Sequence, residues 1–170
     1  YNVTSSVVPR TVEVGSNEYF FGDAVIPTTV NDGTYDYEVT SIAASAFANN
    51  TYITSVSIPN TVTNIGDTAF AGCSSLATVT IGNGLSSLGA YVFNSCTLLT
   101  TVVLPNSVTT MGNGTFYGCS GLTSVTLPNA ITAIPNNTFY NCSNLASITI
   151  PNTVESIGNS AFYSCTSLTA

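Results

Sequence analysis

The chain contains no histidine and no lysine, and Arg10 is its only basic residue. Without histidine or lysine there is no Ser-His-Asp or Cys-His catalytic set, no histidine-liganded metal site and no Schiff-base lysine. Eight carboxylates against one cation give a net charge of −7, which argues strongly against a nucleic-acid partner and disfavours anionic membrane surfaces. No apolar run reaches the roughly 18 residues of a membrane-spanning helix, so we expect no membrane insertion in this segment.

The residues that remain offer little chemistry. The acidic side chains are scattered, and the nearest pair, Asp32 and Asp36, flanks Gly33 in a segment that reads as a solvated hairpin. The five cysteines have no CxxC spacing and fall in a single file, which cannot surround one zinc ion. Their side chains should point alike, so we expect buried free thiols rather than disulfides. The sequence therefore predicts no catalytic residue, no metal site and no cofactor.

Phenylalanine recurs with a fixed period of 23 residues along most of the chain. Cysteine follows three positions later in five of these units, and columns of Val, Ile and Leu keep the same register. A fixed period of this length is typical of a stacked repeat, in which each unit buries its apolar face against its neighbours. The phenylalanines are Phe47, Phe70, Phe93, Phe116, Phe139 and Phe162.

Within a unit, Thr78-Val79-Thr80-Ile81 alternates polar and apolar residues and is rich in β-branched side chains, as in a strand. A Pro-Asn pair then stops the strand in most units, and a second short extended run ends at a glycine such as Gly112. We therefore predict a mostly β repeat solenoid of about six coils, with two short strands per 23-residue coil and little helix. Parallel strands should stack in register, with the phenylalanine column buried.

Two units, IPNTVTNIGDTAFAGCSSL and LPNSVTTMGNGTFYGCSGL, resemble the BspA-type leucine-rich repeat, and the resemblance covers about residues 39 to 170. It implies a leucine-rich-repeat-like solenoid at the surface of a bacterium or microbial eukaryote, extracellular or at the cell surface. It also implies an adhesive, non-enzymatic role. The partners expected from it are a host or matrix protein, a glycan, or copies of the chain itself.

We divide the chain into a capping region, 1–38, and five to six repeats, 39–170. The cap should contain a degenerate first coil, since 24–30 repeats the phrase of 56–62, and a hairpin insert at Asp32-Gly33. The stretch 1–14 fits no repeat and is expected to cap its own first coil or to pair with a neighbour's last one. The last repeat has no polar cap, which predicts a processed protein or a piece of a longer chain.

Two surfaces are candidates for interaction. Outward strand positions form two ranks of hydroxyls, to which Thr78, Thr80, Thr101, Thr126 and Thr149 belong, with Val103 as an interruption. These ranks are compatible with a solvated sheet face, with glycan binding or with ordered water, as on ice-binding solenoids. A stack of tyrosines, Tyr117, Tyr140 and Tyr163, follows the phenylalanine column and suits either packing or an interface. Three functions stay open: an adhesion or protein-interaction module, a surface-fibre subunit assembling head to tail, and an ice- or glycan-binding protein.

Overall fold

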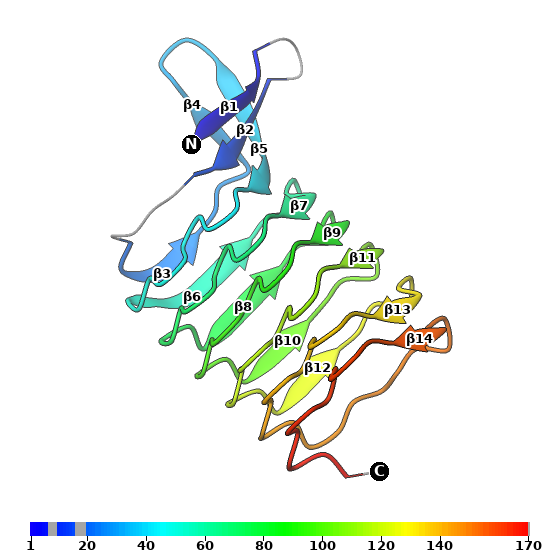
Figure 1. Cartoon of the computed structure of the whole chain (residues 1–170). Coiled ribbons are helices and arrows are strands. Elements are labelled where there is room, and N and C mark those ends of the chain that lie inside the picture. The colour runs from blue at the N-terminus through cyan, green and yellow to red at the C-terminus, as the bar shows by residue number, and fades with distance from the viewer. Residues whose placement is uncertain (7–9, 16–19, 170) are drawn as a thin grey trace.

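The computed structural model, which describes residues 1–6, 10–15 and 20–169, is a β-solenoid of about six stacked coils (Figure 1). No helix occurs within these described ranges. The strands are β1 (Asn2–Ser5), β2 (Thr11–Val14), β3 (Gly22–Val25), β4 (Thr29–Asn31), β5 (Asp36–Ile42), β6 (Ile53–Ile58), β7 (Asn64–Ile65), β8 (Thr78–Ile81), β9 (Ser87–Leu88), β10 (Thr101–Val103), β11 (Thr110–Met111), β12 (Ser124–Thr126), β13 (Ala133–Ile134) and β14 (Ser156–Ile157).

Each full coil contributes one strand to each of two sides of the stack, which confirms the predicted unit. The longer strands form a five-stranded parallel sheet in the order β12-β10-β8-β6-β3. The short strands β7, β9 and β11 continue from β5 along the other side, and β13 and β14 form a separate pair there. Because the period is constant, partners are one repeat apart, as in Val56 opposite Val79. The last coil departs from the pattern, since residues 147–150 form no strand.

The third side of each coil is a tight corner held by a ladder of backbone hydrogen bonds. Alternate residues of one corner donate their N–H groups to carbonyls of the next coil, as Thr68 N does to Ala90 O at 2.8 Å. The residues between them donate within the turn, as Ala71 N does to Thr68 O. Two positions in every corner have positive φ, and most are occupied by residues other than glycine, such as Thr68 and Tyr91. The ladder therefore holds these residues in a conformation that L side chains otherwise avoid.

The phenylalanine column is buried inside these corners, as predicted. Consecutive rings are stacked with centroids 5.1–5.7 Å apart, from Phe47 to Phe162. The four rings from Phe70 to Phe139 are fully buried, and the aliphatic columns of both strands pack around them. Since each buried side chain of this size contributes about 1.5–3 kcal/mol, the ladder is a main source of stability in a chain almost without ion pairs.

Glycine is needed where neighbouring coils approach most closely. A Cβ on Gly112 would lie 2.4 Å from the backbone nitrogen of Ala90 and 2.5 Å from the carbonyl carbon of Gly89. We therefore expect Gly112→Ala to lower the free energy of unfolding by about 3 kcal/mol, through forced separation of two coils. Urea unfolding measures this loss. Gly15→Ala is the control, because its Cβ would meet only the side chain of Asn2 at 3.0 Å; equal losses in the two variants would contradict the steric explanation.

A proline explains why strand pairing is interrupted on the short-strand side. Gly66, Gly89 and Gly112 each donate their N–H to the preceding coil, but Pro135 occupies this column in the next unit and has no N–H to donate. β11 and β13 accordingly do not pair, whereas Gly158 restores the bond, to Ile134 O at 2.7 Å, between β13 and β14.

The N-terminal strands stand at one end of the stack (Figure 1). β4 and β5 form an antiparallel hairpin whose turn contains Asp32 and Gly33. β2 pairs in parallel with β5 of the same chain, and Ala24 of β3 lies opposite Val56 of β6. Val7 and Val8, part of the predicted extended arm, lie outside the described residues. The described strands of the arm, β1 and β2, thus pair with each other and with β5 of the same chain.

Candidate interaction surfaces

The two hydroxyl ranks lie together on the outward face of the five-stranded sheet, which we call the hydroxyl face. Thr78, Thr80, Thr101 and Thr126 are exposed on β8, β10 and β12, and Thr149 continues the rank beyond the last strand. Val103 is 64% exposed in the same rank and interrupts it. The structure therefore gathers all five predicted threonines on one uncharged surface, with polar and apolar groups at its centre.

An acidic residue that the sequence did not single out closes one edge of the hydroxyl face. Asp23 of β3 accepts hydrogen bonds from the hydroxyls of Ser55, at 2.6 Å, and Thr54, at 2.9 Å. These bonds, that from Ser55 foremost, lower the pKa of the Asp23 carboxyl below its ordinary value. The N-terminal edge is therefore anionic, while the remainder of the hydroxyl face carries no charge.

From β6 onward, the sheet beneath the hydroxyl face is incompletely paired at alternate junctions between coils, whereas β3 and β6 are paired at four positions. β6 and β8 are in register at four positions and β10 and β12 at three, but β8 and β10 meet only where Thr101 lies opposite Thr78. The turn asparagines alternate in the same way: Asn60 Oδ1 accepts from Asn83 N at 2.7 Å and Asn106 Oδ1 from Asn129 N at 3.0 Å. In the described chain, Asn83 and Asn129 make no such bond to the coil that follows.

Each open junction carries a groove, and we call these two sites the seam grooves. The first, of about 240 Å³, is lined by β8, β10 and the turns that follow them; the second, of about 300 Å³, is lined by β12 and residues 147–151. The seven residues of the first groove recur two coils later in the second. They are Val79, Thr80, Ile81, Asn83, Thr101, Val103 and Pro105, matched by Val125, Thr126, Leu127, Asn129, Ser147, Thr149 and Pro151.

The predicted tyrosine stack also exists, on the corner side of the coils. The rings of Tyr117 and Tyr140 are parallel at 4.6 Å, and those of Tyr140 and Tyr163 lie 4.8 Å apart. Stacking covers the faces of the middle ring, so this surface presents ring edges and hydroxyl groups rather than open aromatic faces. Burial is the main cause of the raised pKa of Tyr140. Tyr163, 57% exposed, ends the stack with one face uncovered by another tyrosine.

The cysteines are free thiols, and their column has a structural task. Each Sγ donates to the carbonyl oxygen of the phenylalanine in the preceding coil, at 3.0–3.2 Å. Asn50 occupies this slot in the first unit and donates its Nδ2 to Phe20 O at 3.0 Å, so it performs the same task. Burial raises the pKa of Cys73 and of Cys142 to about 12 and that of Cys119 well above its ordinary value. The thiols are therefore protonated and poorly nucleophilic at neutral pH.

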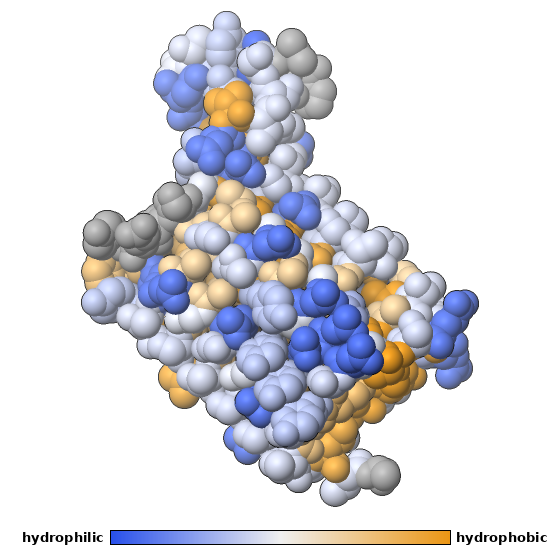
Figure 2. Space-filling model, in the orientation of Figure 1, coloured by the Kyte–Doolittle hydropathy of each residue, from blue (hydrophilic) through white to orange (hydrophobic). Residues whose placement is uncertain are grey.

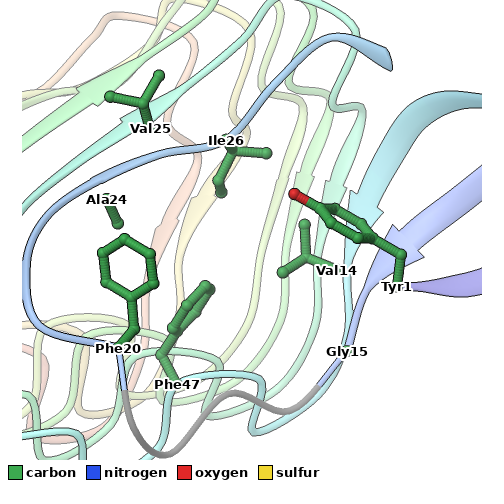
Figure 3. Close-up of a pocket in the computed structure, with 8 residues that line it drawn as sticks. All are labelled: Tyr1, Val14, Gly15, Phe20, Ala24, Val25, Ile26 and Phe47. Carbon is green, nitrogen blue, oxygen red and sulfur yellow. The ribbon is translucent and has the colours of Figure 1, made fainter. Parts of the chain in front are cut away.

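A small apolar pocket lies between the capping strands and the first coil (Figure 3). Phe20 and Phe47 line one side of it, Val14 and Ile26 the other, and the Tyr1 ring lies at its edge. Its volume of about 110 Å³ is below the roughly 150 Å³ of a cavity that holds benzene. Burial raises the pKa of the Tyr1 hydroxyl. The described residues that line the pocket offer no set of polar groups for chemistry, so we interpret it as a packing gap.

The carboxylates of the hairpin are engaged locally. Asp32 accepts hydrogen bonds from the backbone of Thr34 and Tyr35 and from the Tyr37 hydroxyl, and the bond from Tyr35 is the main cause of its lowered pKa. Asp36 accepts from the Asn31 amide at 2.6 Å. These bonds stabilise the turn, as expected of a solvated hairpin. Within the described ranges, no cluster of His, Cys, Asp and Glu is arranged to hold a metal ion, and no helix has the length and apolarity to cross a membrane.

Comparison with known proteins gives a family match and several structural neighbours. The model of the "BspA type Leucine rich repeat region" matches residues 40–169 in six copies. A leucine-rich repeat protein of Treponema pallidum (T. pallidum) is 32% identical, with 86% of this chain and 78% of that chain covered and a TM-score of 0.67. A leucine-rich cell surface protein of Faecalibacterium prausnitzii is 33% identical (94% and 48% covered, TM-score 0.65). A leucine-rich repeat protein of Bacteroides ovatus is 27% identical (98% and 50% covered, TM-score 0.72).

The chain thus spans about half the length of two of these proteins. A search of curated proteins found no match.

Proposed function

The chain belongs to the BspA-type leucine-rich repeat family, and from this membership we propose that it is a non-enzymatic adhesion module of a bacterial cell surface. Proteins of this family are repeat scaffolds, and the similar protein from Faecalibacterium prausnitzii is a cell surface protein. The observation that carries the proposal is the hydroxyl face, which presents one polar, uncharged surface across successive coils. Its partner is a host or matrix protein or a glycan.

The experiment compares adhesion of three chains to surfaces coated with fibronectin, collagen or mucin. We expect the parent to be retained on at least one surface. Replacing Thr78, Thr101 and Thr126 with Lys should reduce retention at least tenfold, because three bulky charges then cover the hydroxyl face. The control replaces Ser86, Thr109 and Thr132 with Lys, which adds the same charge on the short-strand side. Equal losses in both variants, or no retention of the parent, would overturn the proposal.

A surface-fibre subunit is the second candidate, favoured by the exposed end of the last coil. Apolar side chains gather there (Figure 2), and Ile157, whose column is buried or half-buried in earlier coils, is 55% exposed. Because β2 already pairs with its own β5, a head-to-tail contact would use other parts of the capping region. We therefore keep residues 1–38 as a proposed cap.

Light scattering over a concentration series tests this candidate. A fibre subunit should show a mass that rises with concentration in the parent and stays monomeric in Ile157→Lys. A parent that is monomeric at every concentration would exclude assembly through this end.

For the ice-binding alternative, the structure favours a negative result. Ice binding requires a flat and regular array, whereas Val103 and the open junctions interrupt the ranks. We expect the parent chain to show no thermal hysteresis in a nanolitre osmometer, with a glycerol solution of equal osmolality as the control. Measurable hysteresis that disappears when Thr78, Thr101 and Thr126 become Lys would instead establish ice binding.

A further inference from the structure

The seam grooves are built alike, and their construction restricts what they can bind. The seven matched positions of each groove carry hydroxyls, an asparagine amide, aliphatic side chains and a proline, and none of these residues is charged. Thr80 and Asn83 in the first groove, and Thr126 and Asn129 in the second, are exposed. A charged ligand would find no counter-charge there. The lining matches a neutral ligand that both donates and accepts hydrogen bonds.

The open strand edges add backbone groups to this lining. Beyond Thr78, the residues of β8 have no register partner on β10, and β12 has none on residues 147–150. Buried backbone N–H and C=O groups are rarely left without partners, so these edges favour a ligand or water that can satisfy them. In the first groove Val79 and Ile81 are also only half-buried, whereas Val102 and Leu104, which hold these two columns one coil later, are buried. The equivalent Val125 and Leu127 of the second groove are buried as well.

The shape of the seam favours a polyol over an inserted peptide strand as the ligand. An inserted strand needs a further spacing of about 4.8 Å along the whole seam. The pair between Thr78 and Thr101 holds β8 and β10 together at one end, so the first opening is a wedge. Sugar hydroxyls are short groups that donate and accept, and they suit a wedge of this kind. The absence of an aromatic ring among the lining residues indicates weak binding at each groove.

Repetition compensates for weak single sites. Equivalent atoms of the two seam grooves are two coils apart, which corresponds to about 10 Å at the usual strand spacing. A polymer that carries the same group at regular intervals can occupy both grooves, and the second contact then becomes intramolecular. We propose that the two seam grooves together bind a neutral polysaccharide, one segment in each groove. This inference rests on the proposed function, because it names the ligand class of the hydroxyl face.

Affinity electrophoresis in native gels tests the proposal. The gels contain dextran, mannan, galactan or soluble glycol chitin as neutral polymers, and heparin as the acidic control. We expect at least one neutral polymer to retard the chain and heparin to leave it unretarded. Oligosaccharides prepared from that polymer should compete at least tenfold better once they span both grooves. If all four neutral polymers fail, or heparin retards equally, the proposal is wrong.

Substitutions assign the binding to the grooves. Thr80→Met fills the first groove and removes its hydroxyl, and Thr126→Met does the same in the second. Each change should abolish the tenfold advantage of long oligosaccharides, and the double variant should migrate as in a polymer-free gel. Ser57→Met is the control, because Ser57 is exposed in the same column at a closed junction. An equal effect of the control, or retained binding in the double variant, would refute the assignment.

The same double variant separates this inference from the proposed function. If it loses the polysaccharide but still adheres to a protein-coated surface, adhesion has a second determinant and the glycan inference stands. If the parent adheres to protein surfaces and binds no neutral polymer, the glycan inference fails and the proposed function stands. Far-ultraviolet circular dichroism of each variant verifies that the stack is intact.

Discussion

Stability should fall steeply when the pH is raised above about 8.5. In the unfolded chain the thiols ionise near that pH, whereas burial keeps the pKa of Cys73 and of Cys142 at about 12 and raises those of Cys96 and Cys119 further. The folded chain thus retains protons that the unfolded chain releases, so rising pH favours unfolding. The buried thiols make their full contribution to stability below pH 8.5, and this contribution declines as the pH rises toward the pKa of the thiols in the folded state.

The expected magnitude is large because the thiols act together. Each contributes a slope of about 1.4 kcal/mol per pH unit, so four remove roughly 5.6 kcal/mol per unit once the unfolded thiols are ionised. Typical domains have only about 5–15 kcal/mol of stability, so we expect unfolding below about pH 11. Urea unfolding under reducing conditions at pH 7, 8, 9 and 10 measures the slope.

A cysteine variant and a thiol reagent serve as controls for the predicted loss of stability at alkaline pH. Cys119→Ala lowers stability at every pH but should reduce the slope by about a quarter, because one of the four thiols is gone. Native protein should react with a thiol reagent at pH 8 chiefly through Cys165, which is only half-buried, and all five should react in denaturant. A stability that stays flat between pH 8 and 10 would contradict the buried protonated column.

Phe116→Ala should destabilise the protein by about 3–5 kcal/mol. The Phe116 ring is fully buried between those of Phe93, at 5.7 Å, and Phe139, at 5.5 Å, so its removal leaves a cavity between two stacked coils. Corner hydrogen bonds on both sides limit how far the coils can collapse into that space. Urea unfolding at pH 7 should show a lower midpoint with an unchanged m-value.

The matched control for this substitution is Phe162→Ala. Phe162 has the same role in the last coil, but it is half-buried and stacks on one ring only. Its loss should cost less than half as much. Equal costs at the two positions would indicate that the ladder does not stabilise the centre of the stack more than its end.

The sequence predicts the stack because residues of one type recur along the chain with the same period as the stacked coils. Phe70 and Phe93 lie one repeat apart in sequence and in space, and the Asp32-Gly33 pair marks its turn through local geometry alone. The break at Pro135 was not predicted, although a proline in a glycine column removes a backbone donor. These features depend on residue type at a fixed position.

The seam grooves could not be predicted in the same way. Asn60, Asn83, Asn106 and Asn129 are identical residues in identical columns, yet only alternate junctions carry the bond between them. The sequence repeats every coil while the hydroxyl face repeats every second coil, so no single column encodes the difference. The corners pose a similar problem: Thr68, Tyr91 and Asn137 share a positive φ without sharing a residue type. Inter-coil hydrogen bonds impose that conformation, and they depend on the whole stack.

The corner ladder also gives this acidic molecule an electrical direction. From coil to coil, three peptide units per corner have their N–H groups directed toward the C-terminal end and their carbonyls toward the N-terminal end. Aligned peptide dipoles add, as they do along a helix axis, and leave partial positive charge where the N–H groups end. The polarity of the corner side therefore opposes that of the short-strand side, where Gly66 and Gly89 donate their N–H groups toward the N-terminal coil.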